Sequence, residues 1–160
     1  MTASSDLRDV IRGNIRIIYP KKGKSFDRWV TKSSPKWQRV PITQIRRYLS
    51  HECGYDMCWD ESDRTYSHAE AYTFTHYEYN ERRHEGEYPL VGAAIFNIKF
   101  NPVELHFCWI HPFYRNQGLF TKAWPDFIAR YNIFRVDQPS YAMRGVLSTL
   151  GYVDPTLENE

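Results

Sequence analysis

The chain has 160 residues, 42% of them hydrophobic and 25% charged, which is an ordinary composition for a globular protein. Its length suits one domain with its own core. The net charge of +2 is too small to indicate a nucleic-acid partner by itself. No apolar run is long enough to span a membrane, and the three cysteines form no disulfide-rich pattern. We therefore expect a cytoplasmic protein with no membrane partner.

The first half of the chain predicts short, interrupted elements. Residues 15–19 form a β-type run that Pro20 ends. Residues 25–55 have a helical but broken pattern, because Pro35 and Pro41 each interrupt it. We expect two short helices there. The second of them places four apolar side chains on one face: Ile42, Ile45, Tyr48 and Leu49.

Strands dominate the middle of the chain. Residues 69–79 are rich in Tyr, Phe and Thr and predict a strand, as do residues 90–100 and 103–110. The charged stretch 80–87 predicts a hairpin loop, and Asn101-Pro102 predicts a tight connection between two antiparallel strands.

A helix–strand–helix series follows. Residues 118–131 predict a helix that Pro125 kinks, residues 135–137 a strand, and residues 139–150 a second helix. The order of the elements predicts a single α/β (α+β mixed) domain over residues 1–160, with a mixed sheet and helices on both faces.

The junction between strand 103–110 and helix 118–131 is the most informative feature. A helix N-terminus leaves backbone N–H groups unpaired and carries the positive end of the helix dipole. Gly118 lacks a Cβ and lets a ligand approach the backbone closely. The junction therefore predicts an anion site suited to a diphosphate.

The same residues resemble a known signature. Arg115-x-x-Gly118-x-Phe120 is similar to the Arg/Gln-x-x-Gly-x-Gly/Ala motif of the GNAT superfamily of acyl-CoA-dependent N-acetyltransferases. Strand 90–98 and the closing Leu150-Gly151-Tyr152 are also similar, so the resemblance covers residues 90–152. It implies a central, mostly antiparallel twisted sheet. It also implies an acceptor-side half over residues 1–88 and an acyl-CoA-binding half over residues 89–152.

The resemblance implies acetyl-CoA (coenzyme A) as the cofactor. Residues 115–120 would hold the diphosphate, and Ser140 would touch the pantetheine arm. A backbone N–H from residues 108–110 would polarise the thioester carbonyl. The expected cofactor-binding residues are Cys108, Trp109, Ile110, Arg115, Asn116, Gln117, Gly118, Leu119, Phe120 and Ser140. Phe120 departs from the Gly or Ala of the motif, but as a helix residue it can turn its ring into the core.

Three residues are expected to be catalytic. Glu104 is similar to the glutamate that acts as general base through water in histone-type members, and His106, two residues along, is an alternative base. Many members place a tyrosine as general acid where this chain has Leu147, and Tyr141 is a possible substitute. The expected activity is acetyl transfer to an amine by direct transfer in a ternary complex.

Other functions stay open. The same fold could serve as a non-catalytic binding module, or as a nucleic-acid- or nucleobase-modifying enzyme like some phage-borne relatives. The acceptor could be a small molecule, a protein or a nucleic acid, and a homodimer is possible. His51, Cys53, Cys58 and His68 fit a zinc site only loosely, and we expect no metal.

Overall fold

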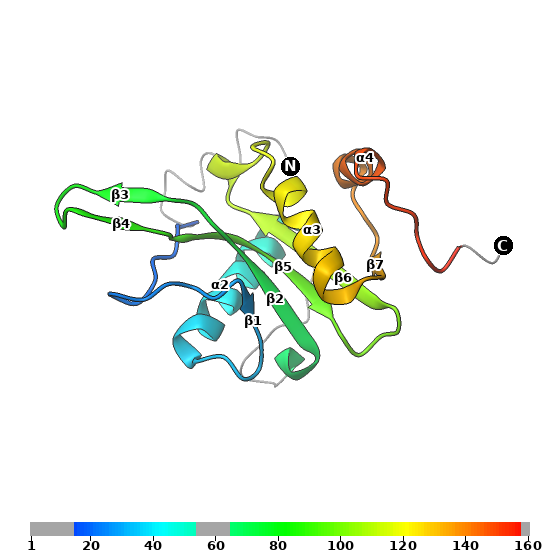
Figure 1. Cartoon of the computed structure of the whole chain (residues 1–160), viewed down its shortest axis with the longest axis horizontal. Coiled ribbons are helices and arrows are strands. Elements are labelled where there is room, and N and C mark those ends of the chain that lie inside the picture. The colour runs from blue at the N-terminus through cyan, green and yellow to red at the C-terminus, as the bar shows by residue number, and fades with distance from the viewer. Residues whose placement is uncertain (1–14, 54–64, 158–160) are drawn as a thin grey trace.

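The computed structural model describes residues 15–53 and 65–157, which form a five-stranded sheet, a separate two-stranded ribbon and three α-helices (Figure 1). The sheet has the order β1-β2-β5-β6-β7. Its strands are β1 Trp29–Val30, β2 Ala69–Thr75, β5 Leu90–Asn97, β6 Val103–Ile110 and β7 Phe134–Val136. The ribbon pairs β3 Glu78–Asn80 with β4 Glu85–Glu87. The helices are α2 Lys36–Cys53, α3 Leu119–Tyr131 and α4 Tyr141–Thr149, with short 3₁₀ turns η1 Thr65–His68 and η2 Pro112–Tyr114.

Strand pairing confirms the expected mixed sheet. Each neighbouring pair in the order β1-β2-β5-β6 is antiparallel. The last pair, β6 and β7, is parallel, and helix α3 makes the crossover between these two strands. Helices cover both faces of the sheet, with α2 on one side and α3 on the other (Figure 1). The predicted α/β (α+β mixed) fold class is therefore confirmed.

The face under α2 is mainly aliphatic, with a few rings. The four apolar side chains predicted to share a helix face are all buried, and they pack against the small and branched residues of β2 and β5 and against the rings of β6. Their spacing places them on one side of the helix, and this amphipathic pattern orients α2 on the sheet.

The opposite face carries an aromatic cluster under α3. The Phe96 and Phe127 rings are fully buried, 5.0 Å apart between centroids and inclined at 69° to each other. Trp29 lies edge-on against Tyr72 and Phe127 and joins β1 to α3. Edge-to-face packing of this kind favours a unique arrangement of rings.

The prediction of two short helices within residues 25–55 is wrong. A turn over residues 31–34 precedes one continuous helix, α2, which contains Pro41. Pro41 lies in the second turn, so its missing N–H costs one hydrogen bond near the helix start instead of ending the helix. Residues 54–55 lie outside the described part of the chain.

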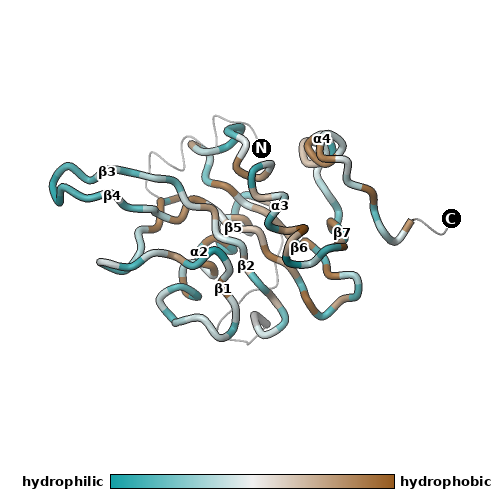
Figure 2. The backbone as a smooth tube through the Cα atoms, viewed as in Figure 1, coloured by the Kyte–Doolittle hydropathy of each residue, from teal (hydrophilic) through white to brown (hydrophobic). Residues whose placement is uncertain are grey.

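Two other segments differ from expectation. The β-type run 15–19 contributes only one isolated bridge, between Ile18 and Leu90. The charged stretch 80–87 is not all loop, because β3 and β4 extend into it and form the ribbon that projects from the sheet (Figure 1). Hydrophilic residues dominate this ribbon, whereas apolar residues concentrate in the central strands (Figure 2).

The outer edge of β7 is held by the turn after α4. The N–H of Asp137 donates to the Leu105 carbonyl of β6, so the N–H of Val136 points to the other side of the strand. That N–H donates to the Tyr152 hydroxyl at 2.8 Å. Gly151, with φ of +76°, makes the turn that brings Tyr152 back toward β7.

None of the helices in the described ranges has the length and apolar character needed to cross a bilayer.

Candidate active site

The turn after β6 is ordered by its own side chains. His111 is 2% exposed, and its Nδ1 accepts a hydrogen bond from the N–H of Phe113 at 3.1 Å, which caps η2. Burial lowers the pKa of His111, and the nearby Arg115 guanidinium lowers it further. His111 therefore shapes this turn as a neutral imidazole.

Arg115 joins the turn to α2. Its Nη1 and Nη2 donate to the two carboxylate oxygens of Glu52, both at 2.7 Å, and its Nε donates to the Ile110 carbonyl at 2.7 Å. Trp109 Nε1 donates to the same carboxylate at 2.8 Å. The structure therefore places the Arg115 side chain on Glu52, and a phosphate at this turn would rely on backbone groups.

The N-terminus of α3 is open. Gly118 is exposed with φ of +78°, a Cβ built on it would meet nothing within 4 Å, and no described side chain caps the helix. The first intrahelical bond runs from the Lys122 N–H to the Gly118 carbonyl, which leaves the preceding amides of the turn without helical partners. No acidic residue lies in the first turn to compete for them.

The Phe120 ring does not cover this opening. Its side chain is 7% exposed and packs in the aromatic cluster, 5.7 Å from both Trp124 and Phe127 between ring centroids. Only the backbone of Phe120 faces the helix start. The departure from the Gly or Ala of the motif is therefore absorbed by the core.

The other predicted residues of this turn are spread around it. Asn116 has φ of +62° and is exposed, and the Gln117 amide donates to the Phe113 carbonyl at 3.0 Å. Leu119 is partly buried against the aromatic cluster. With the side chains placed in this way, the predicted binding of a diphosphate at this turn would depend on its backbone N–H groups.

β6 and β7 diverge and leave a cavity. Their register ends at Leu105 opposite Val136, but β6 continues to Ile110 while the chain turns away at Asp137 toward α4. A cavity of about 160 Å³ lies at this point; we call it the β6–β7 cavity. It is lined by Leu49, Cys53, Leu105, His106, Phe107, Cys108, Val136, Asp137, Gln138, Pro139, Ser140 and Met143.

The backbone of β6 presents polar groups on this side. The His111 N–H donates to the Val91 carbonyl, so alternate residues of β6 direct their main-chain groups toward β5. By this alternation, the groups of Cys108 and Ile110 point to the opposite edge, where β7 has diverged. The main-chain groups of Trp109 point toward β5, and its ring is buried under α2.

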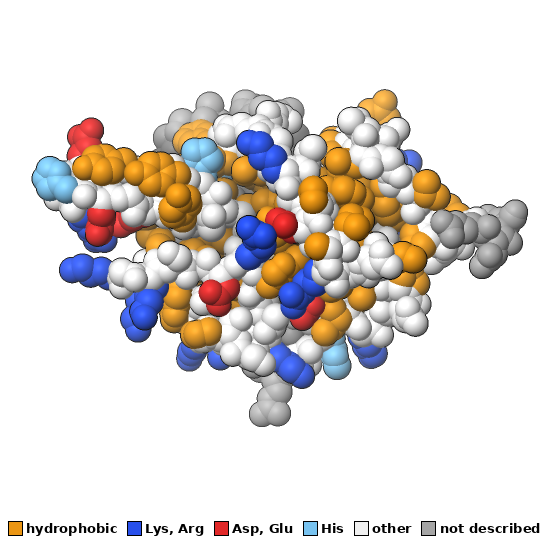
Figure 3. Space-filling model, viewed as in Figure 1, with side chains coloured by type: hydrophobic (Ala, Val, Ile, Leu, Met, Phe, Trp, Pro, Cys, Tyr) orange, Lys and Arg blue, Asp and Glu red, His pale blue; other side chains and the backbone are white. Residues whose placement is uncertain are grey.

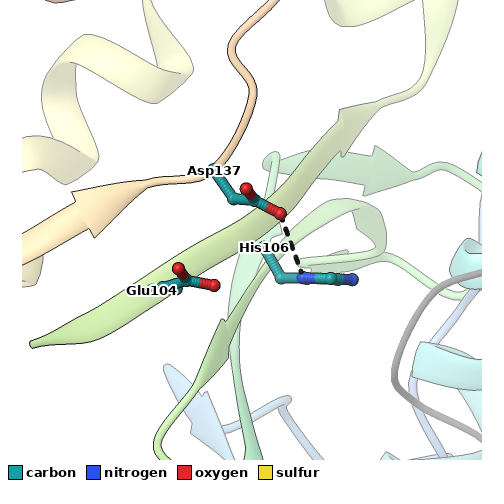
Figure 4. Close-up of side chains that lie close together, drawn as sticks. All are labelled: Glu104, His106 and Asp137. Atoms are coloured by element: carbon teal, nitrogen blue, oxygen red, sulfur yellow. Dashed lines mark ion pairs between the residues drawn. The ribbon is translucent and has the colours of Figure 1, made fainter. Parts of the chain in front are cut away.

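His106 and Asp137 face each other at the cavity wall (Figure 4). The His106 Nδ1 lies 3.7 Å from an Asp137 carboxylate oxygen, and this nitrogen is buried without a hydrogen-bond partner among the described residues. A bulge in β6 places Leu105 opposite Phe96 and Phe107 opposite Ile95, so His106 is the extra residue. Bulges redirect side chains in this way next to functional sites.

Glu104 lies close by, but its carboxylate is engaged by an arginine. Its carboxylate accepts a hydrogen bond from Arg135 Nη1 at 2.7 Å, and the same nitrogen lies 3.5 Å from Asp137. The Glu104 hydrogen bond raises the pKa of Arg135. Glu104, His106 and Asp137 could each offer an atom to a metal ion within 4.8 Å of one another, but the Arg135 cation already pairs with both carboxylates.

The remaining predicted residues divide between the cavity and the surface. Cys108 lines the cavity, and burial raises the pKa of its thiol to about 12, so it is protonated at neutral pH. Ser140 also lines the cavity and caps α4 by accepting a hydrogen bond from the Met143 N–H. Tyr141 is 93% exposed and is not among the lining residues, which gives no support to a role as general acid.

Sequence reasoning missed Glu52, Arg135 and Asp137. The sequence predicts Asp137 as the last residue of a strand, and its position directly after the parallel strand β7 is the signal that could have marked it. His51 and Cys53 lie at the end of α2 and His68 in η1, while Cys58 lies outside the described residues.

Comparison with known proteins agrees with this architecture. No protein-family profile matches the chain, and no curated protein matches it. Among solved structures, the acetyltransferase domain of xEco2 is similar, with a TM-score of 0.52 and 12% sequence identity. The likeness covers 76% of this chain and 82% of that domain, and at this identity it concerns the fold alone. The chain has an acetyltransferase-like fold.

Proposed function

We propose that the protein is an acyl-CoA-dependent N-acyltransferase of GNAT type that uses acetyl-CoA. Two observations carry the proposal: the divergence of β6 from β7, which opens a cavity, and the uncapped start of α3 after the same strand. An elongated thioester cofactor with a diphosphate would fit such a pair of features, the diphosphate on the amides near Gly118 and the arm along β6. The acetyltransferase-like fold supports the proposal.

The backbone of β6 would orient the reacting carbonyl. Bound acetyl-CoA would supply an activated acyl group whose carbonyl carbon is open to attack by an amine. The outward N–H of Cys108 or Ile110 would donate to the oxygen of that carbonyl as negative charge develops on it. The protonated thiol of Cys108 takes no covalent part, which favours direct transfer.

His106 would act as the general base. Its Nδ1 faces Asp137, so Nε2 on the opposite side of the ring is the nitrogen available to an acceptor amine. Asp137 would hold the ring and stabilise the imidazolium; the 3.7 Å separation is long for a hydrogen bond, as is common before substrate binds. We prefer His106 to Glu104 because Arg135 holds the Glu104 carboxylate.

The test separates cofactor binding from catalysis. Titration calorimetry should detect acetyl-CoA binding to the wild-type chain and none to Gly118→Glu, since a carboxylate there repels the diphosphate. His106→Gln should still bind acetyl-CoA but lose at least about a hundredfold in thiol release with an amine panel. His68→Gln, an exposed histidine in η1, is the matched control and should keep full activity.

Two results would contradict the proposal. Absence of binding at high micromolar acetyl-CoA would refute the assignment of acetyl-CoA as the cofactor. Binding without thiol release from any amine would leave the alternative of a non-catalytic binding module.

A further inference from the structure

The short link between β7 and α4 contains a residue in a strained backbone conformation. Gln138 has φ of +41°, in the left-handed region. Asn and His are residue types enriched in that region, and the other non-glycine residues with positive φ in the described part of the chain are His84, Asn116 and Asn132. Gln138 also precedes Pro139, which restricts its backbone further. On backbone grounds alone, glutamine is therefore an unfavourable residue for this position.

The strain arises because both ends of the link are fixed. The Asp137 N–H donates to the Leu105 carbonyl of β6 at 3.0 Å. At the other end, the Ser140 hydroxyl caps α4 by accepting a hydrogen bond from the Met143 N–H at 3.2 Å. The chain turns from β7 into α4 between these two contacts, and Gln138 takes the left-handed conformation there. A glycine would adopt the same conformation without strain.

The side chain of Gln138 lies at the proposed active site. Gln138 lines the β6–β7 cavity together with His106 and Asp137. It is exposed, and its amide makes no hydrogen bond with the described residues. Strained residues cluster at functional sites, where the mechanism needs the side chain that they carry. The strain therefore holds an amide without a protein partner at the wall of the cavity.

The acceptor of acyl transfer needs such a group. A neutral primary amine has one lone pair and two N–H groups. The lone pair forms the new C–N bond as the thioester C–S bond breaks and its electron pair leaves with sulfur, and one N–H gives its proton to Nε2 of His106. The second N–H needs an acceptor once water is displaced, and the amide oxygen of Gln138 can accept from it.

The surface near this link offers little charge to an approaching amine. In the space-filling view, the surface over α4 carries mainly uncharged side chains (Figure 3). An amine that crosses this surface meets little repulsion from cations, and a neutral amide suits these surroundings.

We propose that Gln138 binds the acceptor of the transferase. Its Oε1 accepts a hydrogen bond from the N–H that His106 does not deprotonate, and this contact directs the lone pair of the nitrogen toward the acyl carbon. The inference rests on the proposed function. It adds an acceptor-binding residue, because a nitrogen held by both Gln138 and His106 has only one orientation.

Titration of n-butylamine into the ¹⁵N-labelled full chain tests the contact without turnover. The side-chain NH₂ signal of Gln138, assigned as the signal absent from Gln138→Met, should shift saturably. Butyltrimethylammonium, a cation with no N–H, should bind at least tenfold more weakly. Asn132→Gly is the matched control, since Asn132 is exposed with φ of +63° but does not line the β6–β7 cavity. It should leave the shift unchanged.

Variants of Gln138 separate binding from a backbone role. Gln138→Met keeps the length of the side chain but removes the amide, so KM for an amine should rise at least tenfold. Gln138→Glu keeps an acceptor oxygen at that length and should retain the KM of the wild type. Gln138→Gly relieves the strain, so its melting temperature should not fall, whereas its KM should rise as in Gln138→Met. All three variants should bind acetyl-CoA in calorimetry.

The proposal fails on any of three results. An unchanged Gln138 signal at high millimolar n-butylamine would exclude the contact. Equal affinity for the two cations would show that the N–H groups are not recognised. A wild-type KM in Gln138→Met would leave Gln138 a residue of the turn alone. Absence of acetyl-CoA binding by the wild-type chain is a different failure, since it would refute the proposed function on which the contact depends.

Discussion

Arg115 illustrates how a single residue can serve the site without touching a ligand. Its guanidinium makes a bidentate pair with Glu52 and a third bond to the Ile110 carbonyl, and it lies 5.8 Å from the centre of the Trp109 ring. These contacts fix the turn that leads to α3 against the end of α2. The position of the proposed anion site therefore depends on a contact between residues 63 apart in the chain.

Removal of the Arg115 guanidinium should destabilise the fold. Arg115→Met leaves the Glu52 carboxylate partly buried and without this partner, so we expect a loss of about 2–3 kcal/mol in the free energy of unfolding. Urea unfolding followed by tryptophan fluorescence measures it. Arg83→Met is the control, since Arg83 makes an ion pair with Glu87 but has a side chain 54% exposed. That change should cost less than about 1 kcal/mol. Equal losses in the two variants would show that the turn does not depend on Arg115.

His111 should make stability depend on pH. Burial lowers its pKa in the folded state, so the unfolded chain binds a proton more readily than the folded one. Its contribution is complete above the unfolded pKa of about 6.5 and declines as the pH falls below that value. Urea midpoints at pH 7.5 and 5.5 should therefore differ more in the wild type than in His111→Asn. Parallel pH profiles would refute this assignment.

At the scale of elements, the sequence predicts helices and strands best where the periodicity of hydrophobic residues and the turn-forming residues indicate the same boundaries. β5, β6, α3 and α4 lie close to their predicted ranges, and Gly118 stands at the start of α3 as expected. The ribbon and β1 were missed because three- and two-residue strands carry no readable alternation. Pro41 predicts a break in α2, but the continuous apolar face of the helix outweighs it.

The two exposed glycines of α3 and α4 should respond in opposite ways to alanine. Gly118 has positive φ, so Gly118→Ala strains the backbone and should cost about 1 kcal/mol. Gly145 lies inside α4 with open space around it, so Gly145→Ala should stabilise the protein by about 0.5–1 kcal/mol. Thermal unfolding of both variants gives the two signs. A gain at Gly118 would mean that the turn is not left-handed in solution.

The site itself was only partly predictable. The turn 115–120 and the strand that carries Glu104, His106 and Cys108 follow from local pattern. The partners of these side chains do not, because Arg135 meets Glu104 and Asp137 meets His106 through a parallel pairing that forms only in the folded sheet. The choice of base depends on those partners, and this is why Glu104 and His106 could not be separated from the sequence.

For the whole molecule, the aromatic cluster connects elements that are distant in the chain. Phe127 of α3 lies within 6.2 Å of ring centroids in β1, β2, β5 and β7. Helix α3, which begins at the proposed anion site, therefore packs on the same rings that hold the edge strand β1 on the sheet. We therefore expect binding at this site and folding to be coupled through this core.

Phe127→Ala should test that coupling. Because the ring is fully buried, its removal leaves a cavity and should cost about 3–5 kcal/mol. Phe127→Leu should cost less, and Phe113→Ala, at a residue 53% exposed, should have little effect. Chemical denaturation monitored by circular dichroism measures all three. A loss below about 1 kcal/mol in Phe127→Ala would mean that α3 does not depend on the cluster.

The Tyr152 hydroxyl has a consequence for how copies of this chain meet. Sheets whose last strand offers vacant amides recruit further strands and grow into aggregates. Here the outward amide of Val136 is already engaged by a phenol from the same chain. A further strand could pair with β7 only after displacing that phenol. We therefore expect this edge of the sheet to have little tendency to recruit strands from other copies, even at high protein concentration.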